Sequence, residues 1–213
     1  MRTLIINAHP NFESTTSYTS KLYQHLVDQL KQDKEHELTT LNLYDEDIPT
    51  ITDDFLSMYT KTRTDASFTV AEESLYNRMQ ELLNQFKEHK RIVILMPVHN
   101  FNIPAKLKDY MDNILIPRET FQYTENGSVG LMKDGRKVLF LQSSGSIYTN
   151  NDRYTPLEYG YFYLQSMFVD IMGFDSFEII RAQGSDLKGA DSQNILRTAY
   201  EEMDKILPIF INE

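Results

Sequence analysis

The stretch from Arg91 to Lys108 constrains the fold more than any other part of the sequence. It begins with an apolar run at 92–96 that lacks polar alternation, which predicts a strand buried on both faces, as in the centre of a parallel sheet. Pro97 has no N–H to donate and should end the strand. Polar and aromatic residues follow at 98–102, and Pro104 could open a helix at its first turn. Open α/β sheets bind ligands where buried strands end, so we expect this loop to form the floor of a binding site.

The rest of the chain alternates strand-like and helix-like segments. Apolar or β-branched runs predict strands at 4–8, 38–43, 92–96, 137–141 and 177–181, and helical periodicity predicts helices at 22–30, 53–65, 70–89, 106–116, 159–172 and 190–206. This alternation implies a parallel sheet with right-handed crossovers. We therefore expect a single domain, 1–213, with a three-layer α/β/α fold and the flavodoxin-like strand order 2-1-3-4-5.

One segment departs from the alternation. At 120–131 apolar residues alternate on either side of Asn126-Gly127, which is the strongest short-range signal for a β-hairpin. Such a hairpin would project from the sheet as a flap. It would carry Phe121 and Tyr123 on its first strand.

Composition excludes several classes of protein. The 213 residues include 21 basic and 31 acidic side chains, and the net charge of −10 argues against binding to nucleic acid or to an anionic membrane. The absence of cysteine excludes disulfides, thiolate metal sites and iron–sulfur clusters. No apolar stretch approaches the roughly 20 residues of a membrane span, and the chain enters its first strand without a signal peptide. We therefore expect a soluble cytoplasmic protein.

Three loops should meet at one edge of the predicted sheet, because the strands that they follow are neighbours. These loops are 9–17, 98–102 and 143–146. The first ends in the hydroxyl run Thr15-Thr16-Ser17 at the start of a helix, where backbone N–H groups could hold a phosphate without a lysine. The same run could simply cap the helix. Neither G-x-G-x-x-G nor G-x-x-x-x-G-K-[ST] occurs, so a mononucleotide fits better than a dinucleotide or ATP.

Three motifs resemble those of the FMN-dependent NADH-azoreductases, which belong to the flavodoxin-like NAD(P)H:quinone oxidoreductases. The segment 97–110, PVHNFNIPAKLKDY, is similar to the family pattern P-M-Y-N-F-N-x-P-x-x-L-K-x-[YF]. The segment 121–127, FQYTENG, is similar to F-x-Y-T-E-N-G, and 143–146, SSGS, stands where the family has S-R-G-G. The resemblance keeps the same order and spacing from Leu4 to the last strand.

The resemblance implies a homodimer with an FMN in each subunit, bound in a pocket at the dimer interface. It further implies ping-pong transfer of hydride from NADH or NADPH to flavin N5 and then to a quinone or azo acceptor. The implied cofactor-binding residues are His9, Thr15, Thr16, Ser17, Pro97, Val98, His99, Asn100, Phe101, Ser143, Ser144, Gly145 and Ser146. Phe121 and Tyr123 of the hairpin would border the substrate pocket and roof it.

Two residues depart from the family pattern: His99 replaces a tyrosine and Ser144 replaces an arginine. Histidine titrates near neutrality, with an unperturbed pKa of about 6.5. His99 could therefore donate a hydrogen bond to the flavin or a proton to the reduced substrate. No side chain need be a catalyst in the strict sense, since the redox chemistry belongs to the flavin. No arginine is clearly placed for a 2′-phosphate, so the donor can be NADH or NADPH.

Two features have plainer interpretations. His9 and His99 end neighbouring strands, but no third ligand is placed beside them, so we favour pocket histidines over a metal site. The aromatic run could line a substrate cleft, although core and dimer packing accounts better for most of its members. These members are Tyr159, Tyr161, Phe162, Tyr163 and Phe168.

The alternative function is a flavodoxin-like electron carrier that binds FMN, or a regulatory subunit that binds NAD(P)H without turnover. A carrier has no need of a flap above a substrate. The predicted hairpin at 121–131 therefore favours the enzyme.

Overall fold

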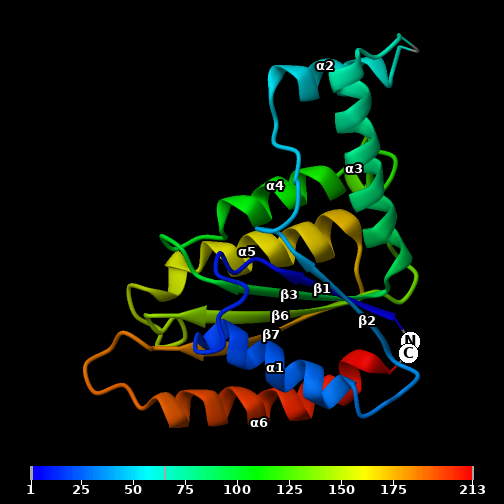
Figure 1. Cartoon of the computed structure of the whole chain (residues 1–213). Helices are drawn as coiled ribbons and strands as arrows, with labels where there is room; N and C mark the ends of the chain where they lie inside the picture. The colour runs from blue at the N-terminus through cyan, green and yellow to red at the C-terminus, as the bar shows by residue number, and fades with distance from the viewer. Residues whose placement is uncertain (1, 65, 213) are drawn as a thin grey trace.

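The computed structural model of the protein describes residues 2–64 and 66–212. A central sheet carries helices on both faces, which gives three layers (Figure 1). Its strands are β1 (Arg2–Asn7), β2 (Glu37–Asn42), β3 (Arg91–Pro97), β6 (Lys137–Ser144) and β7 (Ser176–Gln183), all parallel. They lie in the order β2-β1-β3-β6-β7. Numbered within the sheet alone this order is 2-1-3-4-5, which confirms the predicted flavodoxin-like fold.

The helices occur where periodicity predicts them. They are α1 (Tyr18–Leu30), α2 (Asp53–Lys61), α3 (Val70–Glu88), α4 (Ala105–Ile114), α5 (Tyr159–Gln165) and α6 (Ser192–Ile211). A short 3₁₀ turn (Thr155–Leu157) precedes α5, and a π-helix (Ser166–Met172) follows it. Gly173, at φ 84°, ends this segment in the left-handed region, where glycine has no Cβ to clash.

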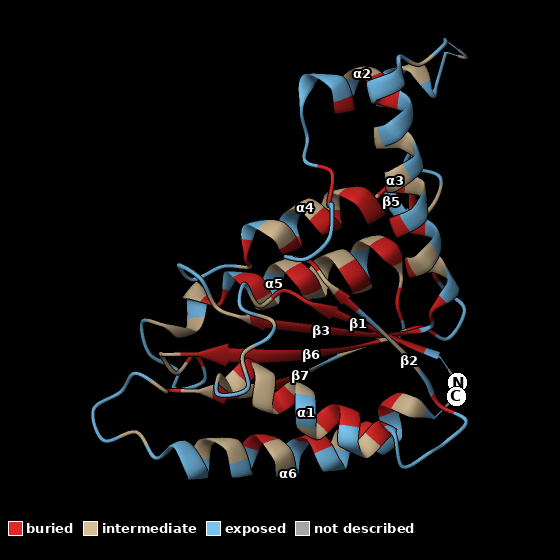
Figure 2. Cartoon of the chain, viewed as in Figure 1, coloured by how far each residue is buried: buried red, intermediate tan, exposed pale blue. Residues whose placement is uncertain are grey.

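Apolar side chains cover both faces of the sheet. Ile92 and Ile94 belong to a cluster with α3, α4 and α5, whereas Val93 belongs to a second cluster with α1 and α6. Every residue of 92–96 is at most 1% exposed, which confirms the prediction of a strand buried on both faces (Figure 2). The missing polar alternation in this stretch is thus explained by its central place in the sheet.

An arm formed by α2 and the first half of α3, described at 53–64 and 66–79, extends away from the sheet (Figure 1). The buried carboxylate of Glu72 fastens its two helices together. It accepts hydrogen bonds from Ser57 Oγ (2.6 Å), Lys61 Nζ (2.6 Å) and the Thr69 N–H (2.7 Å). The bond from Lys61 is the main reason why the pKa of Glu72 falls to about 2. The Glu72 carboxylate therefore joins α2 to the start of α3.

The predicted hairpin forms from β4 (Phe121–Thr124) and β5 (Gly127–Gly130). Thr124 pairs with Gly127, so the turn consists of 125–126, one residue earlier than the Asn-Gly signal suggests. A side chain at Gly130 would clash with the backbone of Met172. The base of the hairpin therefore packs directly on the end of the π-helix.

Pro97 is the last residue of β3 and lies opposite Ser143, which confirms that it ends the strand. Two other predicted boundaries shift in the structure. β6 continues through Ser144, because hydrogen bonding to β7 extends that far, so only the second half of 143–146 is a loop. Pro104 occupies the N-cap of α4 instead of its first turn. Among the described residues, no helix is long and apolar enough to span a membrane.

Candidate functional site

The three predicted loops do converge at the carboxyl edge of the sheet. The N–H of Ala8 donates to the carbonyl of Leu95 (2.8 Å), which joins the ends of β1 and β3. The N–H of Val98 donates to the carbonyl of Ser143 (2.8 Å), which joins the ends of β3 and β6. The loops therefore follow neighbouring strands and share one edge.

A buried contact between hydroxyls joins the first turn of α1 to the end of β6. Thr19 Oγ1 lies 2.6 Å from Ser143 Oγ, and the Thr19 side chain is almost fully buried. Sequence reasoning missed Thr19, although it continues the hydroxyl run of the first loop. Its partner is distant in sequence, so only the fold could reveal the pair.

The first loop folds around Ser14. The Oγ of Ser14 accepts hydrogen bonds from the N–H groups of Thr16 (3.3 Å) and Ser17 (3.2 Å). Ser17 is the N-cap of α1 and accepts from the Ser20 N–H (3.1 Å), so the capping interpretation holds for this residue. Thr15 and Thr16 are exposed. Backbone N–H groups that converge on one oxygen at a helix start suit a phosphate oxygen equally well.

His9 adopts a neutral form in this loop. The Asn11 N–H donates to His9 Nδ1 (3.0 Å), which leaves that nitrogen without a proton. Burial is the main cause that lowers the pKa of His9, and the charge of His99 adds to the lowering. The two histidines are therefore near each other, as expected for residues after neighbouring strands. The described residues contain no cluster of three or more acidic or histidine ligands for a metal.

The second loop is a tight turn in an unusual backbone conformation. Hydrogen bonds in both directions join His99 and Asn102 (3.1 and 2.9 Å). Between them Asn100 and Phe101 have positive φ values of 47° and 66°, as in a type I′ turn. For a bulky residue such as Phe101 this region costs about 1–2 kcal/mol. The turn presents 99–101 to solvent at the edge of the sheet.

The third loop is anchored to the end of β7. Ser144 Oγ donates to the Ser146 carbonyl (2.8 Å), and the Gly184 N–H donates to the Ser144 carbonyl (2.9 Å). At Gly145 any side chain would clash with the Asp186 carboxylate. The backbone of 145–146 therefore lies open at the edge, whereas the side chains of 143–144 are buried.

A buried ionic cluster lies at the ends of the two strands, β6 and β7, that hold this loop. Glu158 Oε1 accepts hydrogen bonds from Gln142 Nε2 (2.8 Å) and Arg181 Nε (2.7 Å), and a second nitrogen of Arg181 reaches Oε2 (2.8 Å). Together they tie the start of α5 to the ends of β6 and β7. The sequence signal was a charged residue, Arg181, directly after the apolar pair Ile179-Ile180 in β7. Its partners lie too far away in the chain to be identified from spacing.

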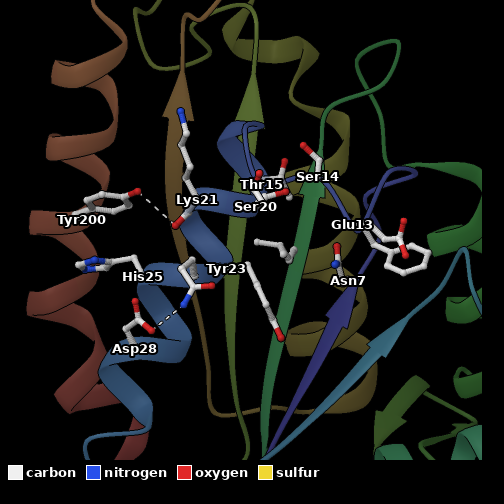
Figure 3. Close-up of a pocket in the computed structure, with 14 residues that line it drawn as sticks. Asn7, Glu13, Ser14, Thr15, Ser20, Lys21, Tyr23, His25, Asp28 and Tyr200 are labelled. Carbon is white, nitrogen blue, oxygen red and sulfur yellow. Dashed lines mark hydrogen bonds between the residues drawn. The ribbon is translucent and has the colours of Figure 1, made fainter.

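A cleft of about 410 Å³ opens beside the first loop and α1 (Figure 3). Asn7, Ser14, Thr15 and Tyr23 are among its lining residues. Residues of the second and third loops do not line it. Of the residues predicted to hold the phosphate, Thr15 lines this cleft, whereas Thr16 and Ser17 do not.

The hairpin lies away from these loops within the chain. It follows α4, whose ten residues run about 15 Å back from the carboxyl edge of the sheet. Tyr123 is 73% exposed, and its ring meets the buried ring of Phe121 edge-on at 5.3 Å. The structure therefore does not bring the two predicted substrate-pocket residues to the three loops of the same chain.

The aromatic run of α5 divides between core and surface. Phe168 is fully buried, and Tyr161 and Tyr163 pack partly buried against the same cluster. Tyr159 and Phe162 are 51% and 47% exposed. Core packing thus accounts for three of the five aromatic residues. The other two rings are exposed and could contribute to an interface or a pocket.

The chain is an α/β protein with a candidate mononucleotide site. Its strands are parallel, a helix begins beside the first loop, and a strained turn follows the central strand β3. The chain belongs to the family with the flavodoxin-like fold, whose sequence pattern matches residues 1–207.

Similar proteins cover nearly the whole chain. An FMN-dependent NADH:quinone oxidoreductase 1 of Lactiplantibacillus plantarum is 51% identical over 205 residues, 95% of each chain. The FMN-dependent NADH:quinone oxidoreductase of Streptococcus agalactiae is 40% identical over the full length of both. A crystal structure of an FMN-dependent NADH-azoreductase from Bacillus anthracis in complex with FMN superposes with a TM-score of 0.94, at 45% identity over 99% of both chains.

Proposed function

We propose that the protein is an FMN-dependent NADH:quinone oxidoreductase that also reduces azo compounds. The observation that carries the proposal is the shared edge of β1, β3 and β6, where a helix start and a strained turn lie side by side. Relatives at 40–51% identity are FMN-dependent NADH:quinone oxidoreductases, which supports FMN as the cofactor and NADH as the hydride donor. Because these relatives are enzymes, they also favour an enzyme over an electron carrier.

Thr15, Thr16 and Ser17 would hold the phosphate, and His9 would lie beside the ribityl chain. The donor set fits an anionic mononucleotide, because it consists of hydroxyls and of N–H groups that converge on one oxygen. The isoalloxazine would lie against the backbone of 97–101 and 143–146. When bound, FMN accepts hydride from NADH and passes it to the acceptor.

Residues 1–213 would act as one FMN-binding domain of a cytoplasmic homodimer. Two observations support the dimer. The exposed rings of Tyr159 and Phe162 offer an apolar surface. The hairpin with Tyr123 lies too far from its own loops to roof them, so it would cover the pocket of the partner.

The test uses the purified full chain under anaerobic conditions. We expect a yellow protein that NADH bleaches and that menadione or methyl red re-oxidises. A protein that bleaches but transfers electrons only to another protein would favour the carrier. A colourless protein that takes up no added FMN would refute the proposal.

A further inference from the structure

A second groove, of about 480 Å³, lies between the arm and the segment 116–123. Met79 and Ile116, which are nearly fully buried members of the third apolar cluster, form its floor. The rings of Tyr59, Tyr76 and Tyr123 are among its walls. The volume falls within the range of pockets that bind small organic molecules. Three aromatic rings around an apolar floor suit a planar ring system.

The rim of this groove carries two arginines, Arg63 and Arg118. Within 2–64 and 66–212, neither guanidinium has an ion pair or a side-chain hydrogen bond. The acidic residue of the groove, Glu119, is already paired with Lys87 at 2.6 Å. In a chain with a net charge of −10, two arginines without such a partner at one groove mark a local preference for anions.

Contacts within the chain support both walls of the groove. Lys61, two residues before Arg63 at the end of α2, donates a hydrogen bond to Glu72 of α3 (2.6 Å). On the opposite wall Arg118 has a positive φ of 74°, a rare conformation for a residue with a side chain. Its N–H donates to the Phe121 carbonyl (2.6 Å), which maintains this turn. Backbone strain of this kind often accompanies ligand-binding positions.

We propose that this groove binds a planar aromatic anion, with Arg63 and Arg118 on the charged group and the tyrosines on the ring. The proposal rests on the proposed function, because the homodimer would bring Tyr123, and with it the groove, to the flavin pocket of the partner. Two substrates of that reaction have this chemistry. One is the adenosine diphosphate end of NADH, and the other is an acceptor that carries a sulfonate or carboxylate.

The experiment compares Arg63→Gln, Arg118→Gln and the double variant with the wild-type full chain. Arg197→Gln is the matched control, because it makes the same charge change on α6, on the other face of the sheet. Calorimetry measures binding of two probes, ADP-ribose and 1-naphthalenesulfonate. Steady-state kinetics then give KM for NADH, for the neutral acceptor menadione and for the sulfonated dye methyl orange.

We expect each single substitution to weaken probe binding about tenfold, because it removes a charge-assisted hydrogen bond to the anionic group of the probe. Weaker ADP-ribose binding together with a raised KM for NADH assigns the groove to the donor. Weaker naphthalenesulfonate binding with a raised KM for methyl orange, and an unchanged KM for menadione, assigns it to anionic acceptors. The control should match wild type throughout.

Unchanged binding of both probes in the double variant would overturn the inference. The proposed function would still stand after that result if the double variant is yellow, is reduced by NADH and has unaltered KM values. The two proposals can therefore fail separately. Conversely, the calorimetry does not depend on turnover. A chain without FMN that binds ADP-ribose through these arginines would retain the groove as a site for nucleotides.

Discussion

Two of the four non-glycine residues with a positive φ in the described chain lie where the flavin is expected. Asn100 and Phe101 occupy left-handed backbone positions at the end of the central strand, and the stack of Phe101 on Tyr154 (6.4 Å between ring centroids) is too loose to explain this conformation. Backbone conformations that cost free energy often occur where they position groups for ligand binding. We therefore relate the strain to the isoalloxazine that would lie on it.

Phe101→Gly should have a more stable fold than Phe101→Ala, and it should weaken FMN binding. Glycine adopts a φ of 66° without a Cβ clash, so we expect the free energy of unfolding to rise by about 1 kcal/mol relative to Phe101→Ala. The alanine variant is the control, because it removes the same ring and keeps the strained backbone. Urea unfolding of the chain without FMN measures the difference. Equal stability of the two variants would show that the turn stores no strain.

His99 should set the pH dependence of turnover. The residue is exposed beside the strained turn, where the family pattern has a tyrosine. If its imidazole gives a proton to the reduced acceptor, replacing it should change the pH dependence of hydride transfer to the quinone. In His99→Tyr we expect an altered pH profile and a rate of this step that is lower by about tenfold or more. Stopped-flow measurement of the oxidative half-reaction checks this, and an identical profile would contradict it.

His36 should make the fold less stable in mild acid. Its ring is buried and lies 2.8 Å from Thr3 Oγ1, and burial is the main cause that lowers its pKa. The unfolded chain therefore takes up a proton at higher pH than the folded chain. This contribution to stability is complete above about pH 6.5 and is lost as pH falls through the folded pKa, by at most about 1.4 kcal/mol per pH unit.

In His36→Gln the loss of unfolding free energy between pH 7.5 and 5.5 should be smaller than in wild type. Urea unfolding at several pH values measures it. His25→Gln is the control, because that ring is partly exposed and stacks on Tyr200 at the surface. It should leave the loss in acid in place. The same acid slope in His36→Gln and wild type would refute the assignment.

At the scale of elements, prediction succeeded where the signal was local. Apolar runs and helical spacing located every strand and helix, and neighbouring strand ends located the loops at 9–17 and 98–102. Contacts between residues that are distant in the sequence could not be predicted. Thr19 contacts Ser143 and Glu158 contacts Arg181, and no spacing rule relates residues that are separated by a crossover. The groove beside Arg118 was missed for the same reason, since its walls come from the arm and from the hairpin segment.

Lys61→Met should loosen the arm without unfolding the sheet. The substitution leaves Glu72, which is buried, without its main partner, and α2 makes its tightest contacts through this carboxylate. We expect amide exchange in α2 to accelerate by about tenfold or more, while exchange in β3 is unchanged. Lys108→Met is the control, because it breaks a more exposed pair with Asp112 on α4. Equal acceleration of α2 and β3 would contradict a local role for the clamp.

At the scale of the whole molecule, one chain does not complete the proposed pocket. The loops that would hold FMN lie at the carboxyl edge, whereas the hairpin lies at the far end of α4. A second copy could supply the missing roof, and the exposed rings of Tyr159 and Phe162 offer a surface for it. Dimerisation and cofactor affinity should therefore depend on each other.

If the protein forms the proposed homodimer, Phe162→Asp should both separate its subunits and weaken FMN binding. The side chain is 47% exposed, so a charge there costs the isolated chain little but would be buried unpaired at an interface. We expect sedimentation velocity to show a monomer and the Kd of FMN to rise by about tenfold or more. Ile209→Asp is the control, because that side chain is 68% exposed on α6, on the opposite face of the sheet. A monomeric Phe162→Asp chain that binds FMN as tightly as wild type would show that each chain completes its own pocket.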